Sequence, residues 1–141
     1  MSAYVIDASV VVKWVVDEAG SDQALRLRRH QLSAPDLLIS ECANIIWKKV
    51  RRGELSDIEA SVAARLLTRA DIDLIPGRRL AARAVELACL LEHSAYDCMY
   101  LALAASSVRP FVTADGHLLR KLSAEGWSTR LTAIDLAQFD D

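Results

Sequence analysis

Residues 4–14, YVIDASVVVKW, decide the fold class of this chain. The β-branched and aromatic run at residues 3–6 predicts a short buried strand that ends at Asp7. Ser9 predicts the N-cap of a helix that runs from Val10 to about Val16. A carboxylate that ends a buried strand has no obvious structural partner, so Asp7 is the first candidate functional residue.

Strand and helix patterns alternate through the rest of the chain, and no two expected strands are joined by a tight hairpin turn. This order predicts parallel strands linked by helical crossovers, hence an α/β sandwich. We expect a single domain over residues 1–141, because this length suits one hydrophobic core. Further strands are expected around Ala34 and at 73–75, 109–113 and 127–131, and further helices at 21–30, 36–52, 56–69, 80–91, 94–105 and 116–124.

Several helix ends have recognisable signals. Pro35 is expected in the first turn of the helix at 36–52, where a missing N–H is harmless. Ser56 and Glu59 form an S-x-x-E capping box. Ser94 and Asp97 resemble a second capping box, which opens the most apolar helix of the chain. That helix is expected to be buried all round.

Composition is that of a globular protein, with 52% hydrophobic and 26% charged residues. The net charge of −2 gives no sign of a nucleic-acid partner, so any basic surface must be local. Cys42, Cys89 and Cys98 each sit in an apolar helical run, which predicts free core thiols in a reducing cytoplasm. No run reaches the roughly 18 apolar residues of a membrane span, and the N-terminus lacks a signal-peptide pattern.

Two acidic residues follow expected strands. Asp7 ends the strand at 3–6, and Asp115 comes directly after Phe111-Val112-Thr113-Ala114. Ligands bind at the carboxyl ends of strands in open parallel sheets. Both carboxylates are therefore expected at one edge of the sheet.

Two further acidic residues lie in apolar helical surroundings. Glu41 flanks the apolar stripe of its helix, and Asp97 lies near the start of the most apolar helix. Buried acids are unfavourable unless they are paired, hydrogen-bonded or bound to metal. Four converging carboxylates would hold Mg²⁺ or Mn²⁺, with one or two binding directly and the others acting through water. A bound ion would activate water to attack a phosphodiester.

Each of these residues also has a structural interpretation. Asp97 can be the acidic member of the Ser94 capping box, Asp115 can be a helix N-cap, and Glu41 can be a solvated residue paired with Lys48 or another base. These alternatives stay open for each residue taken alone.

Basic residues and histidines give weaker signals. The helix that carries Glu41 ends in four basic residues, Lys48, Lys49, Arg51 and Arg52. Their position favours an interaction with the helix C-terminal dipole as the interpretation, over contact with RNA. Lys13, Arg120 and Lys121 lie nearer in sequence to the acidic edge and are candidates for phosphate contact. The spacing of His30, His93 and His117 indicates no zinc site.

Four segments together resemble the PIN-domain ribonucleases, in particular the VapC-type toxins of type II toxin–antitoxin pairs. They are YVIDASVVVKW, PDLLISECANIIWKKVRRGEL, SAYDCMYLALA and RPFVTADGHLLRKL, and the resemblance runs from Tyr4 to about Leu131. It implies a three-layer sandwich with a central parallel sheet of four to five short strands.

The resemblance also implies a function, a metal-dependent endoribonuclease in the cytoplasm. The acids of the family correspond to Asp7, Glu41, Asp97 and Asp115, with Asp7 and Asp97 the most direct Mg²⁺ or Mn²⁺ ligands. Ser9 and Thr113 match hydroxyl positions that orient acids or water. The implied partners are an RNA substrate, a second copy in a homodimer and a VapB-type antitoxin, whose C-terminal segment crosses the active site and through which alone DNA is bound.

Other classes fit less well. Haloacid-dehalogenase-type phosphatases need a second aspartate where Ser9 stands, and receiver domains need an acid pair at Asp7. A flap-type nuclease needs additional DNA-binding elements for which this chain has no room. A non-catalytic interaction module has no need to gather acids, so a large separation between Asp7 and Asp97 would favour it.

Overall fold

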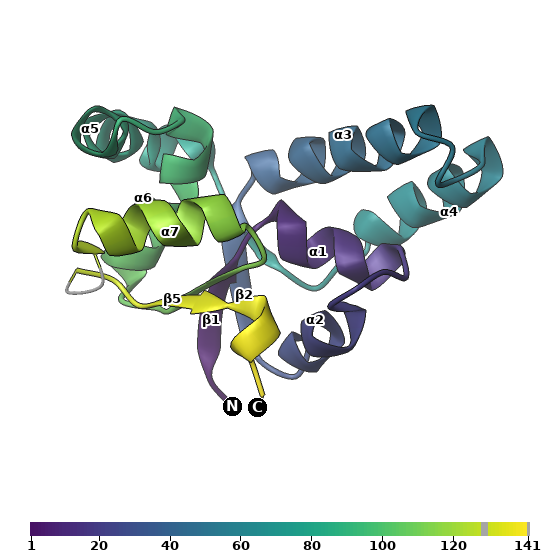
Figure 1. The fold of residues 1–141 in the computed structure, drawn as a ribbon, viewed down its shortest axis with the longest axis horizontal. Coiled ribbons are helices and arrows are strands. Elements are labelled where there is room, and N and C mark those ends of the chain that lie inside the picture. The colour runs from purple at the N-terminus through teal and green to yellow at the C-terminus, as the bar shows by residue number, and fades with distance from the viewer. Residues whose placement is uncertain (128–129, 141) are drawn as a thin grey trace.

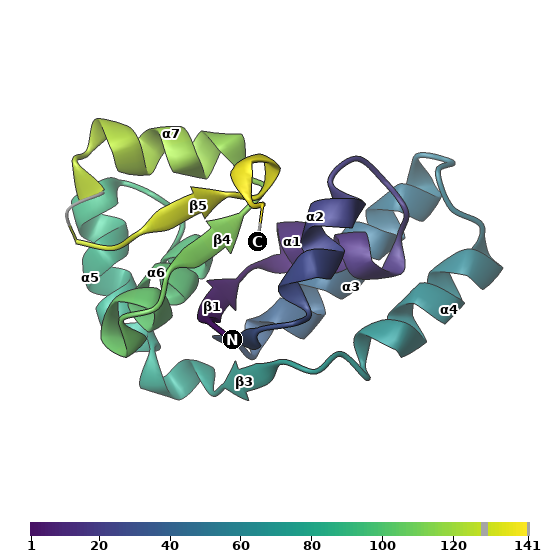
Figure 2. The same cartoon turned by 90° about the horizontal axis from the view of Figure 1, so that it is seen from below.

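The computed structural model describes residues 1–127 and 130–140. It contains a five-stranded parallel sheet with the strand order β3-β2-β1-β4-β5, and Figure 2 labels β5, β4, β1 and β3 in this order across the molecule. This confirms the predicted α/β fold with a parallel sheet. The strands are β1 (Ala3–Ile6), β2 (Gln31–Pro35), β3 (Asp73–Ile75), β4 (Phe111–Thr113) and β5 (Ala133–Asp135).

Seven helices surround the sheet (Figure 1). Helices α5 and α6 lie on one side of it and α1 and α2 on the other (Figure 2), while α3 and α4 project as an antiparallel pair. The helices are α1 (Ala8–Val15), α2 (Ser21–Leu27), α3 (Leu37–Arg51), α4 (Asp57–Leu67), α5 (Ala81–Leu91), α6 (Ala95–Ser107) and α7 (Gly116–Ala124), with short 3₁₀ turns at η1 (Gly77–Arg79) and η3 (Leu136–Gln138).

Strand β1 lies at the centre of the sheet. It pairs with β2 through Tyr4 and Leu32 and with β4 through Val5 and Phe111. The chain builds outward from β1 to β2 and β3, and then crosses over to β4 and β5. The point where the direction reverses lies between β1 and β4, and this is where open α/β sheets bind ligands.

The core fills the space between the sheet and its helices. Helix α6 contacts β1, β2, β4 and α5, which explains why it is apolar around most of its circumference. Its residues Tyr100, Leu101 and Ala102 are almost fully buried, as are Val5 and Ile6 of β1. Within the described ranges, no helix is long and apolar enough to cross a membrane.

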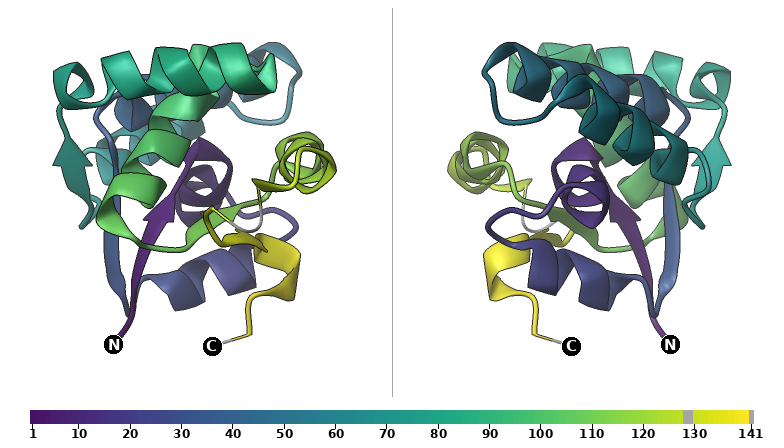
Figure 3. Two further views of the ribbon diagram at one scale, coloured as in Figure 1. Left: turned by 90° about the vertical axis from the view of Figure 1, so that its left-hand side faces the viewer. Right: turned by 90° about the vertical axis from the view of Figure 1, so that its right-hand side faces the viewer.

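The chain returns to its starting strand at the C-terminal end. The ring of Phe139 packs edge-on against Tyr4 at a centroid distance of 5.6 Å and lies 6.1 Å from His30. The two ends of the chain therefore lie together at one end of the molecule (Figure 3). The carboxyl ends of the strands point to the opposite end.

Several local predictions are confirmed and others are wrong. The capping box of Ser56 and Glu59 is present. Ser9 is not a cap, because Asp7 caps α1. Pro35 ends β2 instead of starting a helix, because it is in register with Ile75 of β3 and Asp36 N donates to Ile75 O.

Two other predictions concern the last strand and the cysteines. The last strand is Ala133–Asp135, C-terminal to the predicted 127–131 segment, of which residues 128–129 lie outside the described residues. Cys42 and Cys98 are buried free thiols, as predicted. Cys89 is exposed on α5, because it falls on the helix face turned away from α6.

Candidate active site

Asp7 lies where β1 passes into α1. Its Oδ1 accepts hydrogen bonds from Ser9 N at 3.1 Å and Ser9 Oγ at 2.5 Å, and its Oδ2 accepts one from Thr113 Oγ1 at 2.5 Å. The residue is 8% exposed. Asp7 thus has structural partners that the sequence did not reveal: it is the N-cap of α1, and one of its hydroxyl donors comes from β4.

Ser9 and Thr113 link the ends of the two neighbouring strands. Ser9 Oγ accepts a hydrogen bond from Ala114 N at 2.9 Å and lies 3.3 Å from Thr113 Oγ1. Thr113 Oγ1 also accepts from Asp115 N at 3.0 Å. The structure therefore places both predicted hydroxyl residues against Asp7, and the same network fixes the backbone that leads to Asp115.

Asp115 caps α7, as its structural interpretation predicted. Its Oδ1 accepts hydrogen bonds from His117 N at 3.0 Å and Leu118 N at 3.2 Å. Gly116 follows, and a Cβ on it would lie 3.1 Å from Arg120 Nη1. The guanidinium of Arg120 therefore lies beside the start of this helix, close to the acidic residue.

Glu41 is held from α6 and not by a base on its own helix. Tyr100 donates from its hydroxyl to Glu41 Oε1 at 2.6 Å, and no ion pair with Lys48 occurs among the described residues. Tyr100 is buried and stands one helical turn after Asp97. This i, i+3 spacing was the only sequence signal for its role.

Asp97 is held by a histidine. His93 Nε2 lies 2.6 Å from Asp97 Oδ2, whereas Ser94 caps α6 by accepting from Tyr96 N. The predicted capping box at this position is wrong, because the side chain of Asp97 turns to His93 and not to the backbone of Ser94. Ser94 alone therefore provides the side-chain N-cap of α6.

The four acids interact electrostatically. Burial raises the pKa of Asp7 to about 6, against the lowering effect of the Ser9 and Thr113 hydroxyls, and the charges of Asp97 and Asp115 raise it further. Burial also raises the pKa of Glu41, against the hydrogen bond from Tyr100, with Asp97 again adding to the effect. Asp7 and Asp97 therefore lie within electrostatic reach of each other, so the large separation that would have favoured an interaction module is not present.

The four carboxylates offer oxygen ligands of the kind that a divalent metal ion takes. Within residues 1–127 and 130–140, no three acidic, histidine or cysteine side chains lie close enough to bind one ion together. Mg²⁺ takes only one or two carboxylates directly and keeps several waters. The carboxylates of Asp97 and Asp115 raise the pKa of the buried Asp7, and Asp97 raises that of Glu41, so a cation among these oxygen donors fits that mode of binding because it relieves the repulsion.

The predicted basic residues are distributed differently. Lys13 donates to Ala19 O at 2.8 Å and pairs with Glu18, so it holds a loop and does not face the acids. Lys49 is buried and pairs with the other oxygen of Glu18 at 2.7 Å. Of the three candidates for phosphate contact, Arg120 has its guanidinium beside Gly116, the residue that follows Asp115.

Comparisons with known proteins identify relatives. The family model of the PIN domain matches residues 4–124. Ribonuclease VapC3 of Pyrobaculum aerophilum is 33% identical over 124 residues, which cover 85% of this chain and 95% of that protein.

Solved structures share the fold. PAE2754 from Pyrobaculum aerophilum has a TM-score of 0.64 at 27% identity, covering 96% of this chain and 90% of that one. VapC20 of Mycobacterium tuberculosis, a sarcin-ricin loop cleaving toxin, has a TM-score of 0.63 at 15% identity over 83% and 93% of the two chains. VapBC2 from Rickettsia felis, bound to a promoter DNA fragment, has a TM-score of 0.61 at 12% identity over 94% and 98%. With this fold, this sequence match and Asp7 and Asp115 at the carboxyl ends of β1 and β4, the chain belongs to the PIN-domain family, among the VapC-type ribonucleases.

Proposed function

We propose that this chain is an endoribonuclease that hydrolyses RNA phosphodiesters at the Asp7, Glu41, Asp97 and Asp115 cluster with Mg²⁺ or Mn²⁺. The observation that carries the proposal is the buried Asp7, whose pKa is raised to about 6 by burial and by the neighbouring charges of Asp97 and Asp115. Such an arrangement is unfavourable in a metal-free protein. Strongly perturbed carboxylates at a sheet switch point are typical of a functional site.

The residues of the chain divide the work. Asp7 and Asp97 are the proposed direct ligands, and Glu41 and Asp115 orient the attacking water or the metal's waters. Ser9 and Thr113 keep Asp7 in place through their hydroxyl groups. When bound, the divalent ion lowers the pKa of water and neutralises the charge that develops on the phosphate. Arg120 is placed to contact a neighbouring phosphate.

Cleavage of total cellular RNA by the purified chain tests this function. We expect discrete fragments with Mg²⁺ or Mn²⁺, none with EDTA, and a loss of at least about 100-fold in rate for Asp97→Asn, because electrostatic groups of this kind typically contribute that much. Asp22→Asn on α2, an exposed acid remote from the cluster, is the matched control and should cut like the parent. Equal cleavage by Asp97→Asn and the parent would exclude the four-acid site.

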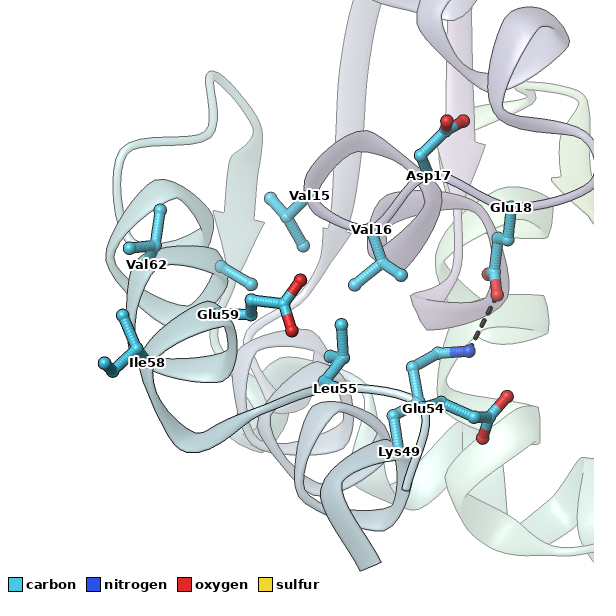
Figure 4. Close-up of a pocket in the computed structure, with 11 residues that line it drawn as sticks. Val15, Val16, Asp17, Glu18, Lys49, Glu54, Leu55, Ile58, Glu59 and Val62 are labelled. Atoms are coloured by element: carbon cyan, nitrogen blue, oxygen red, sulfur yellow. Dashed lines mark hydrogen bonds and ion pairs between the residues drawn. The ribbon is translucent and has the colours of Figure 1, made fainter. Parts of the chain in front are cut away.

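We infer further that a VapB-type antitoxin occupies the groove between the end of α1 and α4 (Figure 4). The groove has a volume of about 520 Å³ and an apolar floor that includes Val15, Leu55 and Val62. Ile58 beside it is 79% exposed. An amphipathic segment binds such a groove through apolar residues spaced along one face.

The charges that line the groove indicate which side chains the bound segment of the antitoxin carries. Asp17, Glu18, Glu54 and Glu59 line the groove together with Lys49, which pairs with Glu18 (Figure 4). Glu54 also pairs with Arg52. Four carboxylates against one lysine make the lining acidic, and a segment with basic residues beside its apolar face fits it. The same basic character suits a segment that continues to the acids of the active site.

A further inference from the structure

His93 is a little-exposed imidazole at the edge of the acidic cluster. Its side chain is 10% exposed, against 32% for Asp97. It stands between two helices, because Glu92 ends α5 in the left-handed conformation (φ 51°) and Ser94 caps α6. From this junction its ring reaches over the first turn of α6 to Asp97, four residues later.

The direction of the hydrogen bond follows from chemistry. An ionised carboxylate has only acceptor sites, so the proton on the 2.6 Å contact belongs to His93 Nε2. The bond therefore fixes Asp97 Oδ2. Among the described residues, no hydrogen bond is made to Asp97 Oδ1.

This contact is not needed to begin the helix. Ser94 already supplies the side-chain cap by accepting from Tyr96 N at 3.1 Å. Asp97 is thus released from the capping role that its sequence position suggests, and its orientation depends on His93. Glu41 is held in the same manner, by one donor on one oxygen, with Tyr100 in place of the histidine.

His93 also contacts the element that carries the last acid. The ring of His117 lies 5.9 Å from the ring of His93, centroid to centroid, with 32° between their planes. His117 stands two residues after Asp115, in the first turn of α7. His93 therefore lies between the helix start that bears Asp97 and the helix start that follows Asp115.

We propose that His93 is a positioning residue, which donates from Nε2 to Asp97 Oδ2 and so presents the other carboxylate oxygen of Asp97 to the divalent ion. The inference rests on the proposed function, since it assumes that Asp97 contacts the ion. Hydrogen-bonded partners of metal ligands fix the orientation of the ligand, and their loss commonly weakens metal affinity by about 10- to 100-fold.

Mn²⁺ binding to the full chain, measured by isothermal titration calorimetry at neutral pH, tests this role without reference to RNA cleavage. We expect His93→Leu to weaken Mn²⁺ binding by about 10- to 100-fold. His93→Gln should restore most of the affinity, because the glutamine amide reaches to the same place as Nε2 and donates a hydrogen bond. His117→Ala, which removes the neighbouring ring but keeps the hydrogen bond, should bind Mn²⁺ close to the affinity of the parent.

The outcomes separate this inference from the proposed function. If the parent binds no Mn²⁺, or Asp97→Asn binds it as tightly as the parent, the metal-site proposal itself fails. If Asp97→Asn loses binding while His93→Leu keeps it, the positioning role is overturned. It is also overturned if His93→Gln restores nothing or if His117→Ala loses as much as His93→Leu. Should His93→Leu fail to melt cooperatively in EDTA, His93→Asn, too short to reach Asp97, replaces it.

Discussion

In the metal-free protein, the hydrogen bonds of Asp7 stabilise its carboxylate, whereas its burial destabilises the charged form. As an N-cap it accepts hydrogen bonds from Ser9, and it is tied to Thr113 on the next strand. Its burial and its acidic neighbours nevertheless favour the protonated form, with a pKa raised from 3.8 to about 6. The residue is thus well held in place but poorly solvated as an anion.

A pH-dependent stability follows from this residue. Because the folded pKa lies above the unfolded one, the folded state binds more protons, and stability present below about pH 4 is lost as pH rises through about 6. The shift corresponds to a loss on the order of 3 kcal/mol. Asp7→Asn, which keeps an N-cap but carries no charge, should therefore be more stable than the parent at neutral pH, by urea unfolding in EDTA.

The comparison has an internal control. Asp7→Asn and the parent should differ least at acidic pH, where Asp7 is protonated, and Asp22→Asn on the surface should show no such dependence. If Asp7→Asn were less stable than the parent at neutral pH, the hydrogen bonds of the carboxylate would outweigh its desolvation, and our interpretation of Asp7 would be wrong.

At the scale of elements, the ends of α6 show how much of a helix is set locally. Its start follows the serine signal at Ser94, as the sequence predicted. Its end is unusual, because Val108 adopts the left-handed conformation with φ 53° and is 89% exposed. A β-branched residue is unfavourable there, by roughly 1–2 kcal/mol.

Replacement of Val108 by glycine should stabilise the protein. Glycine adopts this conformation without steric conflict, although its greater freedom in the unfolded chain offsets about 0.5–1 kcal/mol of the gain. We expect Val108→Gly to raise the free energy of unfolding by about 0.5–1 kcal/mol. Val85→Gly, at an exposed right-handed position inside α5, should instead lower it, and equal destabilisation by both variants would contradict a strained Val108.

At the scale of the whole molecule, the α3–α4 pair makes a surface beside the active site and distinct from it. Asp7 follows β1 and Asp115 follows β4, at the carboxyl end of the sheet, whereas the groove is lined by residues of α1, α3 and α4 and the segments next to them. A partner that binds this groove and extends toward the strand ends would cover both. The proposed antitoxin segment would then recognise the fold at the groove and block the acids at the strand ends.

The groove makes its own prediction. We expect Ile58→Asp to weaken binding of the antitoxin, taken as the small protein encoded next to this chain, by at least about tenfold, equivalent to 1.4 kcal/mol. Leu90→Asp, at a residue 60% exposed on α5, is the matched control. Biolayer interferometry with the tagged antitoxin measures both, and unchanged binding by Ile58→Asp, or an equal loss in Leu90→Asp, would place the partner elsewhere.

Features that depend on neighbouring residues could be predicted from the sequence alone. The strand at Ala3–Ile6, the capping box at Ser56 and the alternation of strands with helices follow from side-chain period and local hydrogen bonds. The parallel sheet followed from the absence of hairpins, and the position of Asp7 and Asp115 at its edge followed from the sheet. These inferences needed no knowledge of strand order.

The contacts between side chains far apart in the chain depend on how the strands and helices pack, and they could not be predicted from the sequence. Strand order placed β1 beside β4, so that Thr113 reaches Asp7, and packing of α6 on the sheet brought Tyr100 to Glu41. His93 contacts Asp97 from the junction that follows Glu92, whose left-handed backbone conformation ends α5. Such contacts depend on the packing of elements far apart in the chain or on one unusual backbone angle, and neither leaves a periodic trace in the sequence.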